Sequence, residues 1–544
     1  MGFLQKGRNW QKLGSMMLTV LLGTSLLLTG CGSKGKNGST GSKKQILTIG
    51  STNAPKSLSP ATMLDTAGLY FMRLMYDSLL GEPAIGQFTN HLAVSFETKD
   101  KQTYTVKLNP KAKWSDGKPL TAEDVIFSLN LAANPKAQSS FTQYLKVLEG
   151  CDEMGKRIKG DTLSSVRKID ATTLEFKCNK PLDPNFVKEQ IGFSVLIFPK
   201  HIYEKIEPTK IAGSPEGTKP TVFSGPYKLV KYVTNDHAEL AANENYVLGK
   251  PKLEKIFYKI QNGTNMVVDL KAGKIQMSAG NIIGKIPVQD VEMLKKEKNL
   301  IVKSNKSLGV QLMEINNANP IFNKDFRLAI AHAINRKQIV DKLYKGYAYL
   351  VPTLYTEASP AYTKDVADFP YDVALAKKEL AASGYDLSRT LHLIVPLGNV
   401  QREQSADIIQ QNLQTLGLTV ELHKMDFPTL LTHARKGDFD MLLIGFNLQA
   451  DPDYQKFFQP GSPSNHSQIN DQKLNEMMRD AAFEADTKKR LKEYHAIQQY
   501  MVDNMFNVPL YGEADFIIQA KDLVGGLKAY WNGSFDDVQE WYFK

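Results

Sequence analysis

The chain has 544 residues, 42% of them hydrophobic and 9% aromatic, with a formal net charge of +10 at pH 7. This length exceeds what one hydrophobic core supports, so we expect two or more lobes in a well-packed protein. The basic excess is dispersed along the chain and no nucleic-acid recognition motif accompanies it, which argues against a nucleic-acid partner.

The N-terminal thirty residues have the three parts of a secretory signal. The basic start comprises Lys6, Arg8 and Lys12. An uncharged run rich in Leu and Met follows over 13–28, and small residues precede Cys31. An uncleaved membrane helix is the alternative interpretation, because the uncharged stretch is long enough to span a bilayer.

Cys31 directly follows Leu-Thr-Gly, and this stretch resembles a bacterial lipobox. The resemblance implies that residues 1–30 are a lipoprotein signal peptide and that Cys31 carries the lipid after cleavage. Residues 31–44 are polar and rich in Gly and Ser, as in a flexible tether. We therefore expect a lipid-anchored protein on the extracellular face of the membrane, in a bacterium of the Gram-positive type.

Two further cysteines, Cys151 and Cys178, flank a polar segment. In an oxidising compartment they are a candidate disulfide pair. Two separate reduced thiols explain the same pattern equally well, so the sequence leaves both alternatives open.

The first half of the mature chain is predicted to be rich in strands. Strands are expected at 45–50, 92–96 and 103–108, within 166–178 and within 222–260. A helix is expected over 66–80 and ends before Gly81. A second helix is expected to begin at Thr121, capped by its hydroxyl, with Asp124 three residues later.

The second half alternates helices and strands. One long amphipathic helix is expected over 323–344. The further predicted helices are 372–380, 401–416, 471–484 and 488–505, and the strands are 391–395, 418–422, 441–445, 508–511 and 516–518. The alternation over 391–445 predicts right-handed crossovers and a parallel sheet, so the fold class is α/β.

Motifs of enzyme chemistry are missing. The chain has no phosphate-binding Gly-Lys loop, Gly-x-Ser-x-Gly elbow, His-Glu-x-x-His pair or Cys-x-x-Cys. The acid pairs Asp438/Asp440 and Asp451/Asp453 are assigned to turns, and the nine histidines are scattered. We therefore expect no catalytic residue, no cofactor and no metal site.

Six stretches, in order along the chain, together resemble the peptide-binding branch of ABC-transporter solute-binding proteins, which includes oligopeptide, dipeptide and nickel binders. They are 108–125, 224–229, 326–336, 371–377, 437–440 and 451–454. The signature positions within them are Trp114, Asp116, Gly117, Asp124, Gly225, Pro226, Tyr227 and Arg327. These residues are assigned to the scaffold, where Arg327 is expected to pair with a carboxylate.

The resemblance implies a two-lobe fold, like that of periplasmic binding proteins, with hinge strands between the lobes. Lobe I is expected over 45–310, with an extra subdomain at about 86–198, and lobe II over 311–505. Residues 506–544 are expected to return to lobe I.

The stretch after the predicted central strand resembles the ligand-lining segment of the family. Its candidate ligand-binding residues are Gly445, Phe446, Asn447, Leu448, Gln449 and Asp451, joined by Asn53 from the other lobe. Several relatives use an Asp for the peptide amine where this chain has Leu448 and Gln449, and Arg402 comes too late for their carboxylate-binding Arg. This favours longer peptides held by their backbone, or a ligand that is not a peptide. The alternative is that Asp451 replaces the missing acid.

The function implied by the resemblance is that of a monomeric, lipid-anchored substrate-binding subunit of an ABC importer. It would bind oligopeptides between closing lobes and deliver them to permease subunits driven by cytoplasmic ATPases, without catalysis. A peptide-pheromone or signalling receptor on the same fold is one alternative. A nickel or metal-chelate binder is another, for which His433 and His466 lie nearest in sequence to the candidate segment.

Overall fold

The structure is a computed structural model that describes residues 45–62, 65–280, 283–527 and 533–544. The predicted signal peptide, the tether and Cys31 lie outside the described residues. Within those residues, no helix is both long and apolar enough to cross a membrane.

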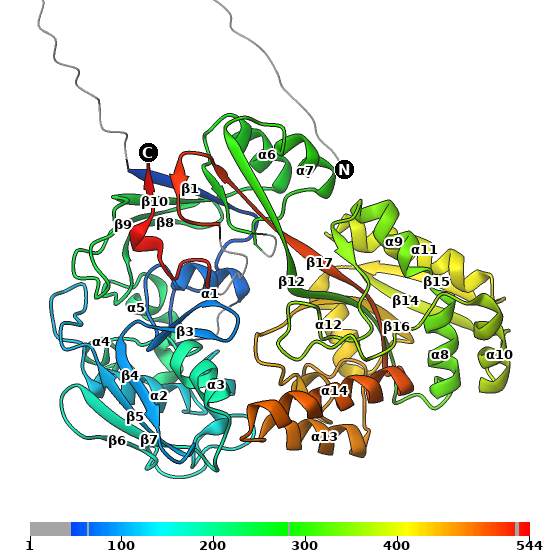
Figure 1. The fold of residues 1–544 in the computed structure, drawn as a ribbon, viewed down its shortest axis with the longest axis horizontal. Coiled ribbons are helices and arrows are strands. Elements are labelled where there is room, and N and C mark those ends of the chain that lie inside the picture. Colours follow the sequence, from blue (N-terminus) through cyan, green and yellow to red (C-terminus); the bar gives the residue numbers. More distant parts are fainter. Residues whose placement is uncertain (1–44, 63–64, 281–282, 528–532) are drawn as a thin grey trace, which may run out of the picture. The chain divides into compact units, whose positions relative to one another are not determined.

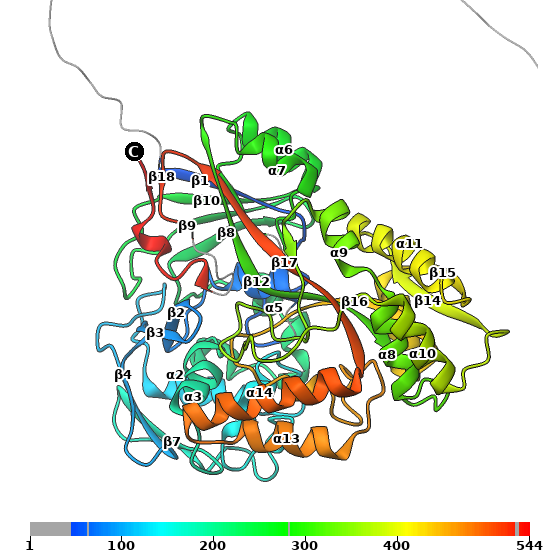
Figure 2. The ribbon, with the colours of Figure 1, turned by 45° about the vertical axis from the view of Figure 1, so that its right-hand side comes forward.

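The described residues form one mixed sheet of eleven strands, in the order β15-β14-β16-β12-β17-β11-β1-β10-β9-β8, with β13 added beside β17. Its strands are β1 (Ile46–Ser51), β8 (Tyr227–Val233), β9 (His237–Ala242), β10 (Lys255–Ile260), β11 (Met277–Ser278), β12 (Leu300–Ile315), β13 (Ala348–Tyr349), β14 (Thr390–Pro396), β15 (Thr419–Met425), β16 (Met441–Asn447) and β17 (Asn507–Ala520). The long antiparallel strands β12 and β17 cross between the two lobes (Figures 1 and 2). The two strands predicted at the C-terminal end are thus one strand, β17.

The first lobe, on the left in Figure 1, is built around a core that draws on residues 47–283 and 517–543. It contains a hairpin of β2 (Leu80–Ala84) and β3 (Gln87–Asn90), and an antiparallel sheet of β4 (Ala93–Thr98), β5 (Thr103–Leu108), β7 (Thr173–Lys177) and β6 (Val166–Lys168). Its helices are α1 (Thr66–Met72), α2 (Ala122–Ala132), α3 (Pro184–Val187), α4 (Lys200–Tyr203) and α5 (Pro215–Thr218). Strands β18 (Leu523–Val524) and β19 (Tyr542–Phe543) pair beside this core, in which Trp541 is fully buried.

The second lobe surrounds the other end of the large sheet with two cores, one on each face. Its helices are α8 (Lys324–Ala333), α9 (Arg336–Ile339), α10 (Val373–Ser383), α11 (Val400–Gln414), α12 (Phe427–Lys436), α13 (Gln472–Ala482) and α14 (Thr487–Asn504). Helices α6 (Gly263–Lys271) and α7 (Val288–Leu294) precede β12. Strand β14 pairs in parallel with β15 and with β16, which confirms the parallel unit predicted over 391–445.

The first two signature stretches lie against each other in the first lobe. Trp114 is fully buried in a turn that Gly117 closes with a φ of +86°. The amide of Ser115 donates to Phe223 O at 2.8 Å, directly before the second stretch. Gly225 has to be glycine, because a Cβ there would lie 2.6 Å from the carbonyl carbon of Met75. These residues therefore hold the scaffold together.

Thr121 and Asp124 form the predicted capping box at the start of α2. The amide of Thr121 donates to the Asp124 carboxylate at 2.9 Å, which satisfies an N–H group that the helix leaves unpaired. The opposite oxygen of Asp124 accepts from the amide of Lys200 at 3.1 Å. Asp124 thus joins α2 to the start of α4.

The helix predicted over 66–80 is too long. Helix α1 ends at Met72, and Leu80 already belongs to β2. The carbonyls of Leu74 and Met75 accept hydrogen bonds from Tyr227 and Gly225 at 2.9 and 2.8 Å. Tertiary pairing with the second signature stretch therefore replaces the helix.

The single helix predicted over 323–344 is also wrong. Ile334 is extended, with φ −87° and ψ 116°, so α8 ends at Ala333. Asn335 then caps α9 by accepting from the amide of Gln338 at 2.9 Å. The amide of Asn335 donates to the Asn412 side chain of α11 at 2.9 Å, so packing against α11 stabilises the break.

The sequence left two alternatives open for Cys151 and Cys178, and the structure has the second of them: the two thiols are separate, free and buried. The backbone of Cys178 forms an antiparallel bridge with Leu148, whereas the backbone of Cys151 forms one with Arg157. Burial raises the pKa of both thiols to about 12, which makes them unreactive.

Arg327 is held by backbone carbonyls and, within the described residues, forms no ion pair with a carboxylate of the kind predicted. Its guanidinium donates to three backbone carbonyls, of Phe322 at 2.8 Å, Asn504 at 3.0 Å and Met505 at 3.1 Å. Burial lowers the pKa of Arg327 to about 10. The side chain therefore closes the C-terminal end of α14 onto α8, because carbonyls at a helix end attract a cation.

Candidate ligand-binding cleft

The end of β16 has an open edge. Strand β14 pairs with β16 only at Met441 and Leu442, whereas β16 continues to Asn447 alongside β12. Burial falls along this strand, from fully buried Met441 to half-buried Gly445 and Phe446 and exposed Asn447. Among the described residues, no strand pairs with the other edge of 445–447. The backbone groups on that edge are placed to pair with an added strand.

A positive corner lies beside this edge. The chain leaves β14 at Pro396 and enters α11, whose first turn carries Arg402. Arg402 Nε donates to Gln311 Oε1 at 2.9 Å, and a Cβ on Gly445 would lie 2.3 Å from Gln311 Nε2. Gln311 therefore links Arg402 to the backbone of Gly445. A helix N-terminus and a guanidinium at the carboxyl ends of parallel strands are suited to binding an anion.

Phe446 supplies an aromatic wall next to the open edge. Its ring centroid lies 4.4 Å from that of Phe457 and 6.0 Å from that of His466. His466 is buried and its Nδ1 lies 3.5 Å from Glu314 Oε2. His466 thus belongs to the interior of the second lobe. Burial raises the pKa of Glu314, which favours its neutral form.

The residues after β16 have different surroundings. The Leu448 side chain is 2% exposed, so it packs in the core. Gln449 Nε2 donates to Tyr144 OH of the first lobe at 2.7 Å. Asp451 is buried, and its two oxygens accept from Arg490 NH1 at 2.7 Å and NH2 at 2.8 Å. Both oxygens of the Asp451 carboxylate are therefore engaged by Arg490. Asp451 has no free carboxylate oxygen with which to replace the missing amine-binding acid.

Arg490 and its neighbours join the two lobes in a buried polar network. Asp183, at the start of α3, lies 3.8 Å from Arg490 NH1. The Glu189 carboxyl accepts from the amide of Asp451 at 3.0 Å. Burial alone would lower the pKa of Arg490, but Asp451 and Asp183 raise it well above its usual range. Burial and the nearby carboxylates raise the pKa of Glu189, which favours its protonated form.

A second ion pair crosses between the lobes at the edge of this network. Lys146 of the first lobe donates to Asp453 of the second. Burial opposes ionisation of Asp453, but Lys146 outweighs it and lowers the pKa of that carboxyl. Helices α13 and α14 lie beside α3 in both views of the ribbon (Figures 1 and 2). Opening of the lobes would have to break these contacts.

Two cavities adjoin the interlobe contacts. The first, of about 250 Å³, is lined from the first lobe by Tyr144 and Gln190 and from the second by Gln449 and Lys456. The second, of about 590 Å³, lies in the first lobe between the start of α1 and residues 134–144. Both are lined by Gln143, Tyr144 and Met154, so they meet at these side chains. Cavities of this combined size accommodate several side chains of a ligand.

Other predicted site residues lie apart from the open edge. Asn53 follows β1 and is exposed, and its described hydrogen bonds are to its neighbours Ser51 and Thr52. His433 of α12 bonds Asp438 at 3.0 Å. The signature residues Trp114, Asp116, Gly225 and Arg327 all have structural contacts of their own.

The sequence did not reveal the contribution of Tyr144 from the first lobe, and it undervalued Arg402. Tyr144 and Gln449 are 305 residues apart, so no local pattern connects them. Arg402 follows the strand by several residues, and its position at the open edge depends on how the chain turns into α11.

Comparison with known proteins agrees with this architecture. A family model described as bacterial extracellular solute-binding proteins, family 5 (middle), matches residues 87–468. The oligopeptide-binding protein AppA of Bacillus subtilis (strain 168) is 26% identical over 563 residues, which cover 98% of this chain and 99% of AppA.

Solved structures give the same fold. AppA in complex with a nonapeptide matches with a TM-score of 0.78 at 24% identity, over 92% of this chain and 99% of that chain. CtaP of Listeria monocytogenes, an ABC transporter substrate-binding protein, has a TM-score of 0.79 at 28% identity over the same shares. NikZ of Campylobacter jejuni, solved with Ni(L-His), has 0.77 at 22% identity, over 92% of this chain and 100% of that chain. The predicted α/β fold of two lobes is confirmed.

Proposed function

This chain belongs to family 5 of the bacterial extracellular solute-binding proteins, and on that premise we propose that it binds oligopeptides as the lipid-anchored substrate-binding subunit of an ABC importer. The family binds solutes and does not catalyse reactions on them. AppA, similar over almost its whole length, is named for oligopeptide binding.

The open edge of β16 is the observation that carries the proposal. A peptide lying beside Gly445, Phe446 and Asn447 would extend the sheet as an added strand. Main-chain hydrogen bonds of this kind do not depend on the ligand's side chains. The binding mode therefore suits a protein that accepts peptides of many sequences.

Among the described residues, the cleft offers a charged partner for the C-terminal end of the peptide but not for its N-terminal end. Arg402 and the N-terminus of α11 offer a positive corner for the ligand's carboxylate. The Asp451 carboxylate is held by Arg490, so it is not free for the ligand's amine. With only one end anchored, the length of the peptide is not fixed, and the two cavities supply room for its side chains.

Closing of the lobes around the ligand would present a defined surface to permease subunits, while the lipid on Cys31 would keep the cleft near the membrane. A signalling receptor would use the same cleft and differ only in its partner. A nickel-chelate binder is less well supported, because the likeness to NikZ shows the fold alone and His433 and His466 are held by acids outside the open edge.

Native mass spectrometry of the protein purified from its own host tests this proposal. A ladder of bound masses separated by amino-acid residue masses is expected. A single small mass would instead identify a dedicated solute, and stoichiometric nickel with a small chelator would identify the metal-chelate alternative. Either of these two results would contradict oligopeptide binding.

A further inference from the structure

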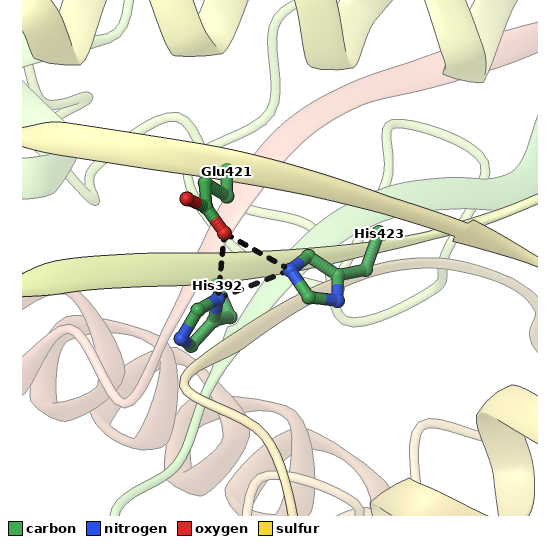
Figure 3. Close-up of side chains that lie close together, drawn as sticks. All are labelled: His392, Glu421 and His423. Carbon is green, nitrogen blue, oxygen red and sulfur yellow. Dashed lines mark hydrogen bonds and ion pairs between the residues drawn. The ribbon is translucent and has the colours of Figure 1, made fainter.

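Three polar side chains converge on one face of the second lobe's sheet, at its β15 edge (Figure 3). His392 lies on β14, opposite Glu421 of β15, and His423 follows Glu421 by two residues. Side chains two residues apart on a strand point to the same face. The parallel pairing of β14 and β15 therefore fixes all three on one surface.

Their ligating atoms form a nearly regular triangle. His392 Nδ1 lies 3.1 Å from His423 Nε2, and Glu421 Oε2 lies 3.7 and 3.6 Å from these two atoms. A triangle with these sides has its corners about 2.0 Å from its centre, which is the length of zinc–nitrogen and zinc–carboxylate bonds. A metal ion at this centre would lie within bonding distance of all three atoms.

The arrangement also matches the chemistry of such an ion. His392 Nδ1 and His423 Nε2 lie only 3.1 Å apart. At this distance the lone pairs of the two nitrogens would repel each other unless a proton or a cation lay between them. A proton can bridge only one pair of atoms, whereas a divalent cation accepts all three donors at once. Two imidazoles and one carboxylate are a donor set that suits Zn²⁺.

We propose that His392, Glu421 and His423 form a binding site for a divalent transition-metal ion of the zinc class. Within the described residues, these three side chains form the group whose possible ligand atoms all lie within 4.8 Å of one another. Three protein ligands leave a coordination position open to water or to another molecule. The ion would fasten the edge strand β15 to β14.

This site is distinct from the proposed peptide cleft. The amide of His392 bonds Asp440, directly before β16, whereas the open edge lies at the other end of that strand. Four residues of strand, 441–444, lie between Asp440 and the open edge at 445–447, a span of about 16 Å. His392 and His423 also line a cavity of about 340 Å³, together with His433 of α12. The sequence hides this group, because His392 precedes Glu421 by almost thirty residues.

Zinc titration of the purified protein, without an affinity tag and in competition with a chromophoric chelator, tests the site. The wild-type protein is expected to bind one Zn²⁺. The substitutions His392→Asn and His423→Asn are each expected to weaken binding at least 100-fold, and Glu421→Gln at least 10-fold. His237→Asn is the matched control, since the ion-pair partners of His237 in the described part of the chain are the acids Asp236 and Glu239.

Thermal unfolding provides the second readout. Zinc is expected to raise the melting temperature of the wild-type protein and of His237→Asn, and to leave that of His392→Asn unchanged, because only a folded site binds the ion. All three ligands are exposed, so the variants should fold as the wild type does without metal. Wild-type zinc affinity in the His392→Asn, His423→Asn double variant, or no binding by the wild type at millimolar zinc, would overturn the proposal.

Discussion

The carboxylate of Asp451 accepts two hydrogen bonds from the guanidinium of Arg490, at 2.7 and 2.8 Å, and both side chains are buried. Asp451 lies four residues after Asn447, the end of the open edge that we assign to ligand binding, yet its carboxylate pairs with a buried arginine. Arg490 also lies 3.8 Å from Asp183 of the first lobe. The pair therefore joins the candidate cleft to the contact between the lobes.

Substitution of Asp451 by Ala should destabilise the protein while leaving peptide affinity nearly unchanged. The variant leaves Arg490 buried without its main partner, which costs about 3–5 kcal/mol of unfolding free energy. Urea unfolding and a peptide-binding titration would measure the two effects. Asp438→Ala is the control, because Asp438 forms an exposed pair with His433 and should cost less than about 1 kcal/mol. Lost affinity at unchanged stability would instead identify Asp451 as an amine anchor.

Substitution of Arg402 by Gln should weaken the binding of peptides that carry a free C-terminal carboxylate. Loss of one charge-assisted hydrogen bond corresponds to about 1.5–3 kcal/mol, which is roughly a 10- to 100-fold change in affinity. C-terminally amidated peptides should bind the variant and the wild type alike. Arg435→Gln, in the last turn of α12, is the control. An equal loss for both kinds of peptide would contradict a role in carboxylate binding.

His91 should make the stability of the first lobe dependent on pH. Burial alone would lower its pKa, but Asp77 at 2.7 Å and Asp536 at 3.1 Å raise the pKa of His91 to about 10. Folding then favours the protonated form, so its stabilising effect is complete below pH 6.5 and is lost as the pH rises towards 10.

Comparison with His91→Gln isolates this effect. The extra stability of the wild type over the variant should fall by about 1.4 kcal/mol for each pH unit between 6.5 and 10. Urea unfolding at pH 6.5, 8.0 and 9.5 would measure it. A difference that stays constant over this range would show that His91 is neutral in the folded protein.

Substitution of Cys31 by Ser should release the protein from the membrane or leave its signal unprocessed. The ligand affinity of the purified variant should equal that of the wild type, because we place the ligand in the folded lobes. Cell fractionation and a peptide-binding titration would measure the two effects. A variant that stays in the membrane fraction after cleavage would contradict lipid anchoring through Cys31.

The sequence predicted the elements that local patterns specify. Met441 to Ile444 are apolar without interruption and form a strand inside the sheet, and Asp372 caps α10. Helix breaks set by tertiary contacts were not predictable in this way: Ile334 leaves the helix where Asn412, almost eighty residues later, accepts a hydrogen bond. The residues of the cleft divide in the same way, into those that a local pattern indicates and those that only tertiary contacts bring together. Its segment after β16 was recognised by resemblance, whereas the contact of Gln449 with Tyr144 depends on how two distant parts of the chain meet.

The central claim is that the ligand pairs its backbone with the open edge of β16. Amide hydrogen exchange of residues 445–447, with and without a saturating peptide, tests this claim most directly. We predict slower exchange in this segment when the peptide is bound, with no change in the edge strand β15, which lies away from the cleft. Unchanged exchange at 445–447 under saturating peptide would contradict the account.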